Sequence, residues 1–116
     1  MMIGFLNPIW FYQKPVDFRK QIDGLTLIIS DQLRQNPASG QLFVFRNRQA
    51  NKIKLLWWDE HGFWLCYKRI EKGHFKFPKD QNGSVELSKD QFLVLIAGLD
   101  FMQQNYLKKS KPTQFF

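Results

Sequence analysis

The sequence predicts a single α+β domain in which an antiparallel β-meander packs against a long N-terminal helix, with a shorter C-terminal helix. Apolar residues recur at helical spacing after residue 15, at alternating spacing between residues 40 and 78, and at helical spacing again after residue 88. The expected strands are consecutive, and the expected helices flank them in sequence. A layered α+β arrangement follows from that order.

The first expected elements are a short strand and a long helix. Residues 9–12 form an apolar run that predicts an edge strand before Pro15. From residue 16 onward, apolar side chains recur three or four positions apart, at Phe18, Ile22, Leu25, Ile29 and Leu33. This period predicts an amphipathic helix over residues 16–35, which Asn36-Pro37 ends because the residue before a proline avoids helical backbone.

The middle of the chain predicts four consecutive strands. Apolar and polar residues alternate over residues 41–46, 52–59, 63–70 and 75–77, with turn residues between the runs. Residues 59–62 suit a hairpin loop with a left-handed glycine at Gly62, which places Asp59 opposite Phe63. In that register Trp58 faces Trp64, and Lys54 faces Lys68 on a solvent-exposed side. The other side is then the expected core, formed by Ile53, Leu55, Trp57, Leu65 and Tyr67.

The last expected helix begins after Ser88. Ser88 and Gln91 have the spacing of a capping box ahead of an apolar run, which predicts a helix over residues 89–98 that Gly98 ends. Residues 1–102 are therefore assigned to one domain. Residues 103–116 are polar and basic and are expected to form a flexible tail.

Composition limits the class of protein. The chain has 116 residues, 44% of them hydrophobic, with no apolar run near the ~20 residues of a membrane span. Its one cysteine, Cys66, cannot form an internal disulfide, and no signal peptide is recognisable. We therefore expect a cytoplasmic protein with no membrane association.

Positive charge is concentrated in the middle of the chain. The formal net charge is +7, and residues 41–79 hold nine basic residues against three acidic ones. Such a cluster, interleaved with aromatic residues, predicts nucleic-acid binding, with DNA the expected partner. The candidate binding residues are Arg46, Arg48, Lys52, Lys54, Trp58, Trp64, Lys68, Arg69 and Lys72. The alternative for the cations is a solvated basic turn, and for the tryptophans it is packing beneath a helix.

No catalytic site, metal site or cofactor is predicted. Asp59, Glu60 and His61 occupy consecutive turn positions whose side chains diverge, so turn formation explains them without a metal, even with His74 added. Cys66 lacks the local signature of a cysteine nucleophile, and no phosphate-binding glycine loop is present. We expect a protein that is not an enzyme.

Four stretches of the chain resemble one family. They are VDFRKQIDGL (16–25), SGQLFVFRNR (39–48), KIKLLWWDEHGFWLCYKRIEKGHFKFP (52–78) and LSKDQFLVLIAGLDF (87–101). Together they are similar to the small accessory protein of insertion sequence 66 type transposable elements, the second reading frame, often called TnpB. The central block is the most specific part, with Lys54, Trp57, Trp58, Asp59, Gly62, Lys68, Arg69, Gly73 and Pro78.

The resemblance implies a role in transposition beside a separately encoded transposase, with no established enzymatic chemistry. The sequence departs from the usual pattern at Asn47, Ala50 and Asn51, where glycine and arginine are frequent, and at Phe101, where tryptophan is common. Two hypotheses follow. The first is a DNA-binding accessory protein. The second is an adaptor that recruits or stabilises the transposase, for which exposed aromatic residues and the tail ending in Phe115 and Phe116 would provide contacts.

Overall fold

A computed structural model describes residues 7–78 and 83–98, and these residues form an α+β fold built on a five-stranded mixed sheet. In chain order the elements are β1 (Ile9–Tyr12), α1 (Ile22–Asp31), β2 (Leu42–Arg46), β3 (Lys52–Trp58), β4 (Phe63–Arg69), β5 (Ser84–Leu87) and α2 (Lys89–Ile96). The strand order is β4-β3-β2-β1-β5. The predicted domain limit at residue 102 and the basic tail lie outside the described residues.

The predicted antiparallel meander is wrong, because the sheet is mixed and contains a parallel pair of strands. β1 is paired on both sides, parallel to β2 and antiparallel to β5, so it is not an edge strand. Helix α1 is the crossover that joins the parallel pair, as parallel strands require. Residues 75–77, predicted as a strand, are irregular in the structure.

The N-terminal helix is ten residues long, whereas the sequence predicted one over residues 16–35. Its start is delayed because the backbone before Ile22 is held in other bonds, including one from the Val16 N–H to the carbonyl of Arg46. Its end comes early because Arg34 adopts a positive φ of 55° and Gln35 N–H bonds back to the carbonyl of Ile29. A left-handed residue just after a helix is a common helix end, and here it precedes the proline that was expected to stop the helix.

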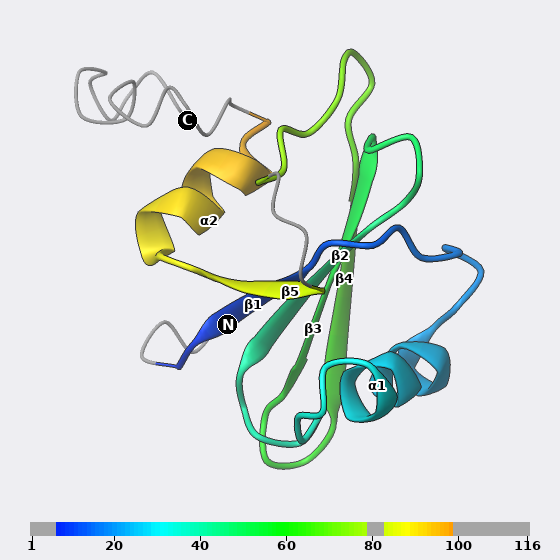
Figure 1. Cartoon of the computed structure of the whole chain (residues 1–116), viewed down its shortest axis with the longest axis vertical. Helices are drawn as coiled ribbons and strands as arrows, with labels where there is room; N and C mark the ends of the chain where they lie inside the picture. Colours follow the sequence, from blue (N-terminus) through cyan, green and yellow to red (C-terminus); the bar gives the residue numbers. More distant parts are fainter. Residues whose placement is uncertain (1–6, 79–82, 99–116) are drawn as a thin grey trace.

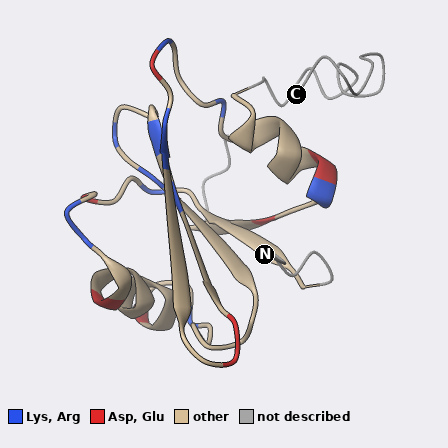
Figure 2. Cartoon of the chain, turned by 180° about the vertical axis from the view of Figure 1, so that it is seen from behind, with Lys and Arg blue, Asp and Glu red and all other residues tan. Residues whose placement is uncertain are grey.

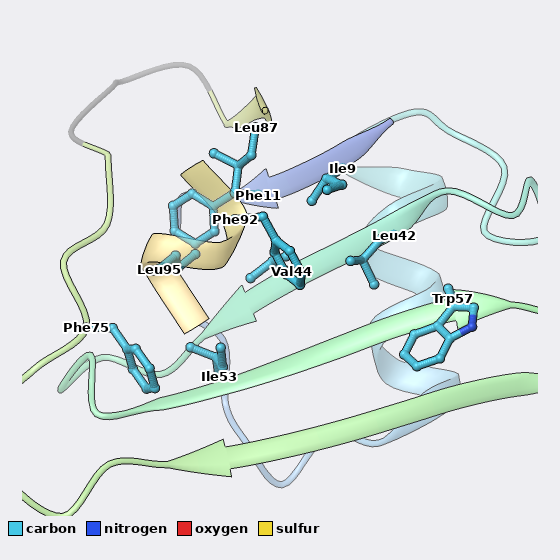
Figure 3. Close-up of a cluster of buried hydrophobic side chains, with 10 residues drawn as sticks. All are labelled: Ile9, Phe11, Leu42, Val44, Ile53, Trp57, Phe75, Leu87, Phe92 and Leu95. Atoms are coloured by element: carbon cyan, nitrogen blue, oxygen red, sulfur yellow. The ribbon is translucent and has the colours of Figure 1, made fainter. Parts of the chain in front are cut away.

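The two helices cover opposite faces of the sheet, as Figure 1 shows. Phe92 and Leu95 of α2 pack on one face, in the cluster drawn in Figure 3. Leu25 and Ile29 of α1 pack on the other face. Successive residues of β2 alternate between the two clusters, so this strand is buried on both sides and its sequence is continuously apolar.

Helix α2 follows its prediction closely. The Ser88 hydroxyl accepts a hydrogen bond from Gln91 N–H, and the Gln91 side chain accepts one from Ser88 N–H, which completes the capping box. The helix ends at Ile96, two residues earlier than predicted, and Gly98 adopts the left-handed conformation expected of a terminating glycine.

The hairpin between β3 and β4 is shifted by one residue from the predicted register. Trp58, and not Asp59, pairs with Phe63. The loop has four residues, and the positive φ falls on Glu60 (85°) and not on Gly62. Because side chains alternate across a sheet, the shift changes every cross-strand pair, and Lys54 now lies opposite Tyr67.

Candidate nucleic-acid interface

Basic side chains gather where β3 begins and β4 ends. Lys52 lies directly opposite Arg69, and Ile53 lies opposite Lys68. Arg48 is exposed in the turn before β3, and Lys72 is exposed in the loop after β4. We call this group the basic end of the sheet: Arg48, Lys52, Lys68, Arg69 and Lys72. Figure 2 shows basic segments near this end of the β3–β4 hairpin, with an acidic segment in the loop after β4, and an acidic turn at the other end.

A buried asparagine organises the turn that presents Arg48 and Lys52. The Oδ1 atom of Asn47 accepts hydrogen bonds from the backbone N–H groups of Asn51 (3.1 Å) and Lys52 (3.0 Å). Its Nδ2 donates to the side chains of Asn51 (2.7 Å) and Gln49 (3.2 Å). The side chain thus replaces backbone partners that a tight turn lacks. Sequence reasoning treated Asn47 only as a departure from the family pattern, although asparagine in a turn is a recognisable signal.

The same turn is tied to the segment after β4. Phe75 N–H bonds to the carbonyl of Ala50 at 2.7 Å, and Ile70 N–H bonds to the carbonyl of Asn51 at 2.9 Å. The Nδ1 of His74 lies 2.7 Å from the carbonyl oxygen of Gln49, so this nitrogen carries the proton. The backbone of the basic end is therefore fixed at several points before any partner arrives.

Lys54 is not part of the exposed surface, contrary to the sequence prediction. Only 5% of the residue is exposed. Its Nζ donates to the carbonyl oxygens of Phe18 (2.8 Å) and Lys20 (2.7 Å) and lies 4.9 Å from the centre of the Phe18 ring. Burial lowers the pKa of this lysine. Lys54 thus fastens the segment before α1 to the sheet.

Arg46 also has partners within the protein. Its Nε donates to the carbonyl of Gln13 at 2.9 Å, and its guanidinium lies 5.8 Å from the centre of the Phe77 ring. Burial, and then the nearby charge of Arg48, lowers the pKa of Arg46. Its position is that of a half-buried packing residue beside the basic end.

Three predicted residues are exposed at the basic end but differ in their contacts. Lys68 reaches across to the C-terminus of α2, where its Nζ donates to the carbonyl of Ile96, a favourable place for a cation. Arg69 pairs with Glu71 at 2.9 Å, and both side chains remain largely exposed. Within the described residues, Lys72 makes no side-chain hydrogen bond or ion pair.

The two predicted stacking residues lie at the opposite end of the hairpin. Trp58 is half-buried and packs edge-to-face on Phe63. Trp64 is 44% exposed, stacks on Trp57 with ring centres 6.0 Å apart, and donates its indole N–H to Asp59 at 2.7 Å. The tryptophans are therefore not brought together with the cations.

A groove lies next to the basic end on the α1 side of the sheet, with a volume of about 850 Å³. One wall is the segment of residues 15–21, the end is the turn of residues 47–49, and β3 and β4 form the floor. Arg48, Lys52 and Tyr67 line it. Sequence reasoning assigned Tyr67 to the core, but it is 54% exposed.

The described residues offer no alternative site for a metal. They contain no group of three or more His, Cys, Asp or Glu side chains that could hold an ion. Asp59 and His61 lie in the loop between β3 and β4, whereas His74 bonds to the turn at the basic end. Neither helix in residues 7–78 and 83–98 has the length and apolar character to cross a bilayer.

Comparison with known proteins identifies the family. Residues 7–106 match the family described as IS66 Orf2 like protein. The chain is 34% identical to the uncharacterized protein y4jC of Sinorhizobium fredii over 101 residues, which cover 87% of this chain and 86% of that protein. It is 33% identical to the uncharacterized protein y4hO of the same strain over 93 residues, covering 80% and 81%. No solved structure gives a significant match. This family is not a known class of enzyme, and the chain belongs to it as a transposition-associated accessory protein of the IS66 Orf2-like type.

Proposed function

We propose that this accessory protein binds DNA through the basic end of its sheet. The observation that carries the proposal is the direct cross-strand pairing of Lys52 with Arg69, beside Arg48 in the adjoining turn. Like charges that face each other across a sheet repel, and phosphate groups would relieve that repulsion. We further propose that the protein acts in the cytoplasm, since a chain whose one cysteine cannot form an internal disulfide suits a reducing compartment.

The backbone of the basic end is held in place by hydrogen bonds, which favours a binding site over a basic turn that is merely solvated. The hydrogen bonds of Asn47 and His74 hold the backbone around Arg48 in place. A fixed backbone loses less conformational entropy on binding than a mobile loop does. Arg48 and Lys52 make no side-chain hydrogen bond or ion pair with the part of the chain that the structure describes, so their charges are available to a partner.

A salt titration of duplex DNA binding tests the proposal. If about four phosphates are neutralised, the logarithm of the association constant falls with the logarithm of salt concentration with a slope near −3.6. The double variant Arg48→Glu/Lys52→Glu should bind at least about tenfold more weakly and with about half that slope. Circular dichroism should show an unchanged fold, because neither side chain is buried.

A matched control changes the net charge equally at the other end of the sheet. Arg34 precedes β2, and Lys89 follows β5, whose last residue pairs with the first residue of β1. Arg34→Glu/Lys89→Glu should keep most of the wild-type affinity and slope. Equal losses in both double variants would show that net charge alone, and not the basic end, determines binding.

The adaptor hypothesis is the second candidate, and exposed apolar side chains favour it. Leu27 on α1 is 61% exposed and Tyr67 on β4 is 54% exposed. The tail residues Phe115 and Phe116 lie outside the described residues. A wild-type protein that binds no nucleic acid at low ionic strength, yet co-purifies with the transposase of its element, would replace DNA binding with this role.

A further inference from the structure

Tyr67 is an exposed aromatic residue held in place within the groove. Its ring meets that of Phe18 at 65°, with centres 6.2 Å apart, in an edge-to-face contact. Phe18 is itself held, because Lys54 binds its carbonyl and lies over its ring. Tyr67 is therefore supported on one side while more than half of the residue stays exposed.

Cations stand at a defined spacing from this ring. Tyr67 lies opposite Lys54 in the sheet, and Lys52 is two residues further along β3 on the same face. Tyr67 and Lys52 are therefore diagonal neighbours across the two strands, roughly 7 to 8 Å apart, which is comparable with the separation between a base and its own phosphate in a nucleotide. Arg48 closes the groove at the same end.

The one carboxylate that lines the groove is already paired. Asp17 accepts hydrogen bonds from the Arg19 guanidinium at 2.6 and 3.0 Å, and that contact holds the pKa of Asp17 well below its usual range. Its negative charge is thus offset locally. An anion at Lys52 and Arg48 meets no unpaired carboxylate among the groove-lining residues.

We infer that the groove binds one unpaired nucleotide of single-stranded DNA, with the base stacked on Tyr67 and the phosphate at Lys52 and Arg48. This inference rests on the proposed function, because both use the same two cations. Stacking on a protein ring requires a base face that no neighbouring base covers, which a single strand offers and an intact duplex does not. The groove volume lies within the usual range of small-ligand sites.

The test compares single-stranded with duplex DNA in ring variants. The probes are a dye-labelled oligothymidine of about 12 nucleotides and a duplex of the same length, within the site sizes usual for such proteins. Tyr67→Leu keeps apolar contact with Phe18 but removes the stacking face. It should weaken oligothymidine binding roughly 5- to 150-fold and leave duplex binding within about twofold, and Tyr67→Phe should retain binding.

A matched control removes an exposed ring from the other face of the same strand. Trp64→Leu changes a residue three positions from Tyr67 that packs on Trp57 and lies outside the groove. It should leave affinity for both probes unchanged. Equal losses in Trp64→Leu and Tyr67→Leu would overturn the inference, because they would indicate a general effect on β4.

The outcomes separate this inference from the proposed function. Binding of both probes that depends on Arg48 and Lys52 but not on Tyr67 would overturn the groove as a nucleotide site and leave DNA binding intact. If neither probe binds, both ideas fail. If Tyr67→Leu loses binding to the transposase and retains oligothymidine affinity, the groove is a protein-docking site.

Discussion

The two ends of the β3–β4 hairpin carry opposite charges and use them differently (Figure 2). At the acidic end, Asp59 accepts hydrogen bonds from the N–H groups of His61 and Gly62 and from the indole of Trp64. These bonds, that of His61 first, lower the pKa of Asp59. At the basic end the neutral side chain of Asn47 shapes the turn. The charged groups of Arg48 and Lys52 are thus left for a partner, whereas that of Asp59 builds its own loop.

The comparison shows why a run of charges in sequence does not by itself define a binding surface. Lys52 and Lys54 are two residues apart on one strand and share a face. Both line the groove, but Lys52 makes no side-chain hydrogen bond or ion pair within the described residues, whereas Lys54 is buried and bonds to two carbonyl groups. Only the depth of each position in the fold distinguishes a structural cation from an available one.

The largest expected effect separates these two lysines. Lys54→Met removes both hydrogen bonds and leaves the carbonyl groups of Phe18 and Lys20 without that donor, which should destabilise the protein by about 2 to 4 kcal/mol. Lys52→Met should change stability by less than about 0.5 kcal/mol and should instead weaken DNA binding. Urea denaturation measures the first effect, and anisotropy the second. Equal stabilities of the two variants would contradict the structural role of Lys54.

A second prediction concerns the turn at the basic end. Asn47→Ala removes four hydrogen bonds at a buried position and should cost about 1 to 3 kcal/mol, with weaker DNA binding because Arg48 and Lys52 lose their fixed positions. Asn47→Asp retains the acceptor for the N–H groups of Asn51 and Lys52 and should lose less stability. Thermal unfolding ranks the stabilities of the wild type and the two variants. An Asn47→Ala protein as stable as the wild type would show that the turn is held mainly by its contacts with residues 70–75.

The sequence predicts those parts of the fold that depend on local signals. The capping box at Ser88 and Gln91 marks helix α2, and alternation marks β3 and β4. The pairing of β1 with β2 was missed because a parallel contact between strands 30 residues apart leaves no local pattern. The hairpin register was missed because Asp59 closes a four-residue loop with its side chain, where the glycine suggested a shorter one.

Within the candidate site, the sequence identifies the charged residues but not their environment. Arg48, Lys52 and Lys72 lie at the basic end, but Lys54 was placed on the surface because its face of β3 was expected to be open to solvent, whereas the segment before α1 covers it. The one-residue error in register put Trp64 on the face of Trp58 and Lys54, and it put Tyr67 on the core side. The groove depends on the segment before α1, which was predicted to be helical, so no sequence signal indicated it.

The third prediction concerns the acidic end, where Asp59 should make the stability of the fold depend on pH. Because the pKa of Asp59 in the folded protein is below the usual value for an aspartate, about 3.9, its ionised form stabilises the fold above about pH 4, and this contribution is lost as pH falls further. Asp59→Asn should therefore show a smaller drop in melting temperature between pH 7 and pH 3 than the wild type. Some drop should remain, because the pKa of Asp17 is also lowered. The Glu60 carboxylate makes no hydrogen bond within the described residues, so Glu60→Gln should behave as the wild type does.

The smallest expected effect tests the two ends directly by removing one acidic charge from each. Glu71→Gln releases Arg69 from its exposed ion pair, which should alter stability by less than about 1 kcal/mol. It should tighten duplex binding by about two- to fivefold, because a cation at the basic end is freed and a nearby negative charge is lost. Glu60→Gln makes the same change in net charge at the acidic end. The seven residues of β3 separate the two ends by roughly 20 Å, which exceeds the screening length of about 8 Å at physiological salt. Glu60→Gln should therefore leave affinity unchanged, and equal gains in the two variants would show that DNA does not distinguish one end of the hairpin from the other.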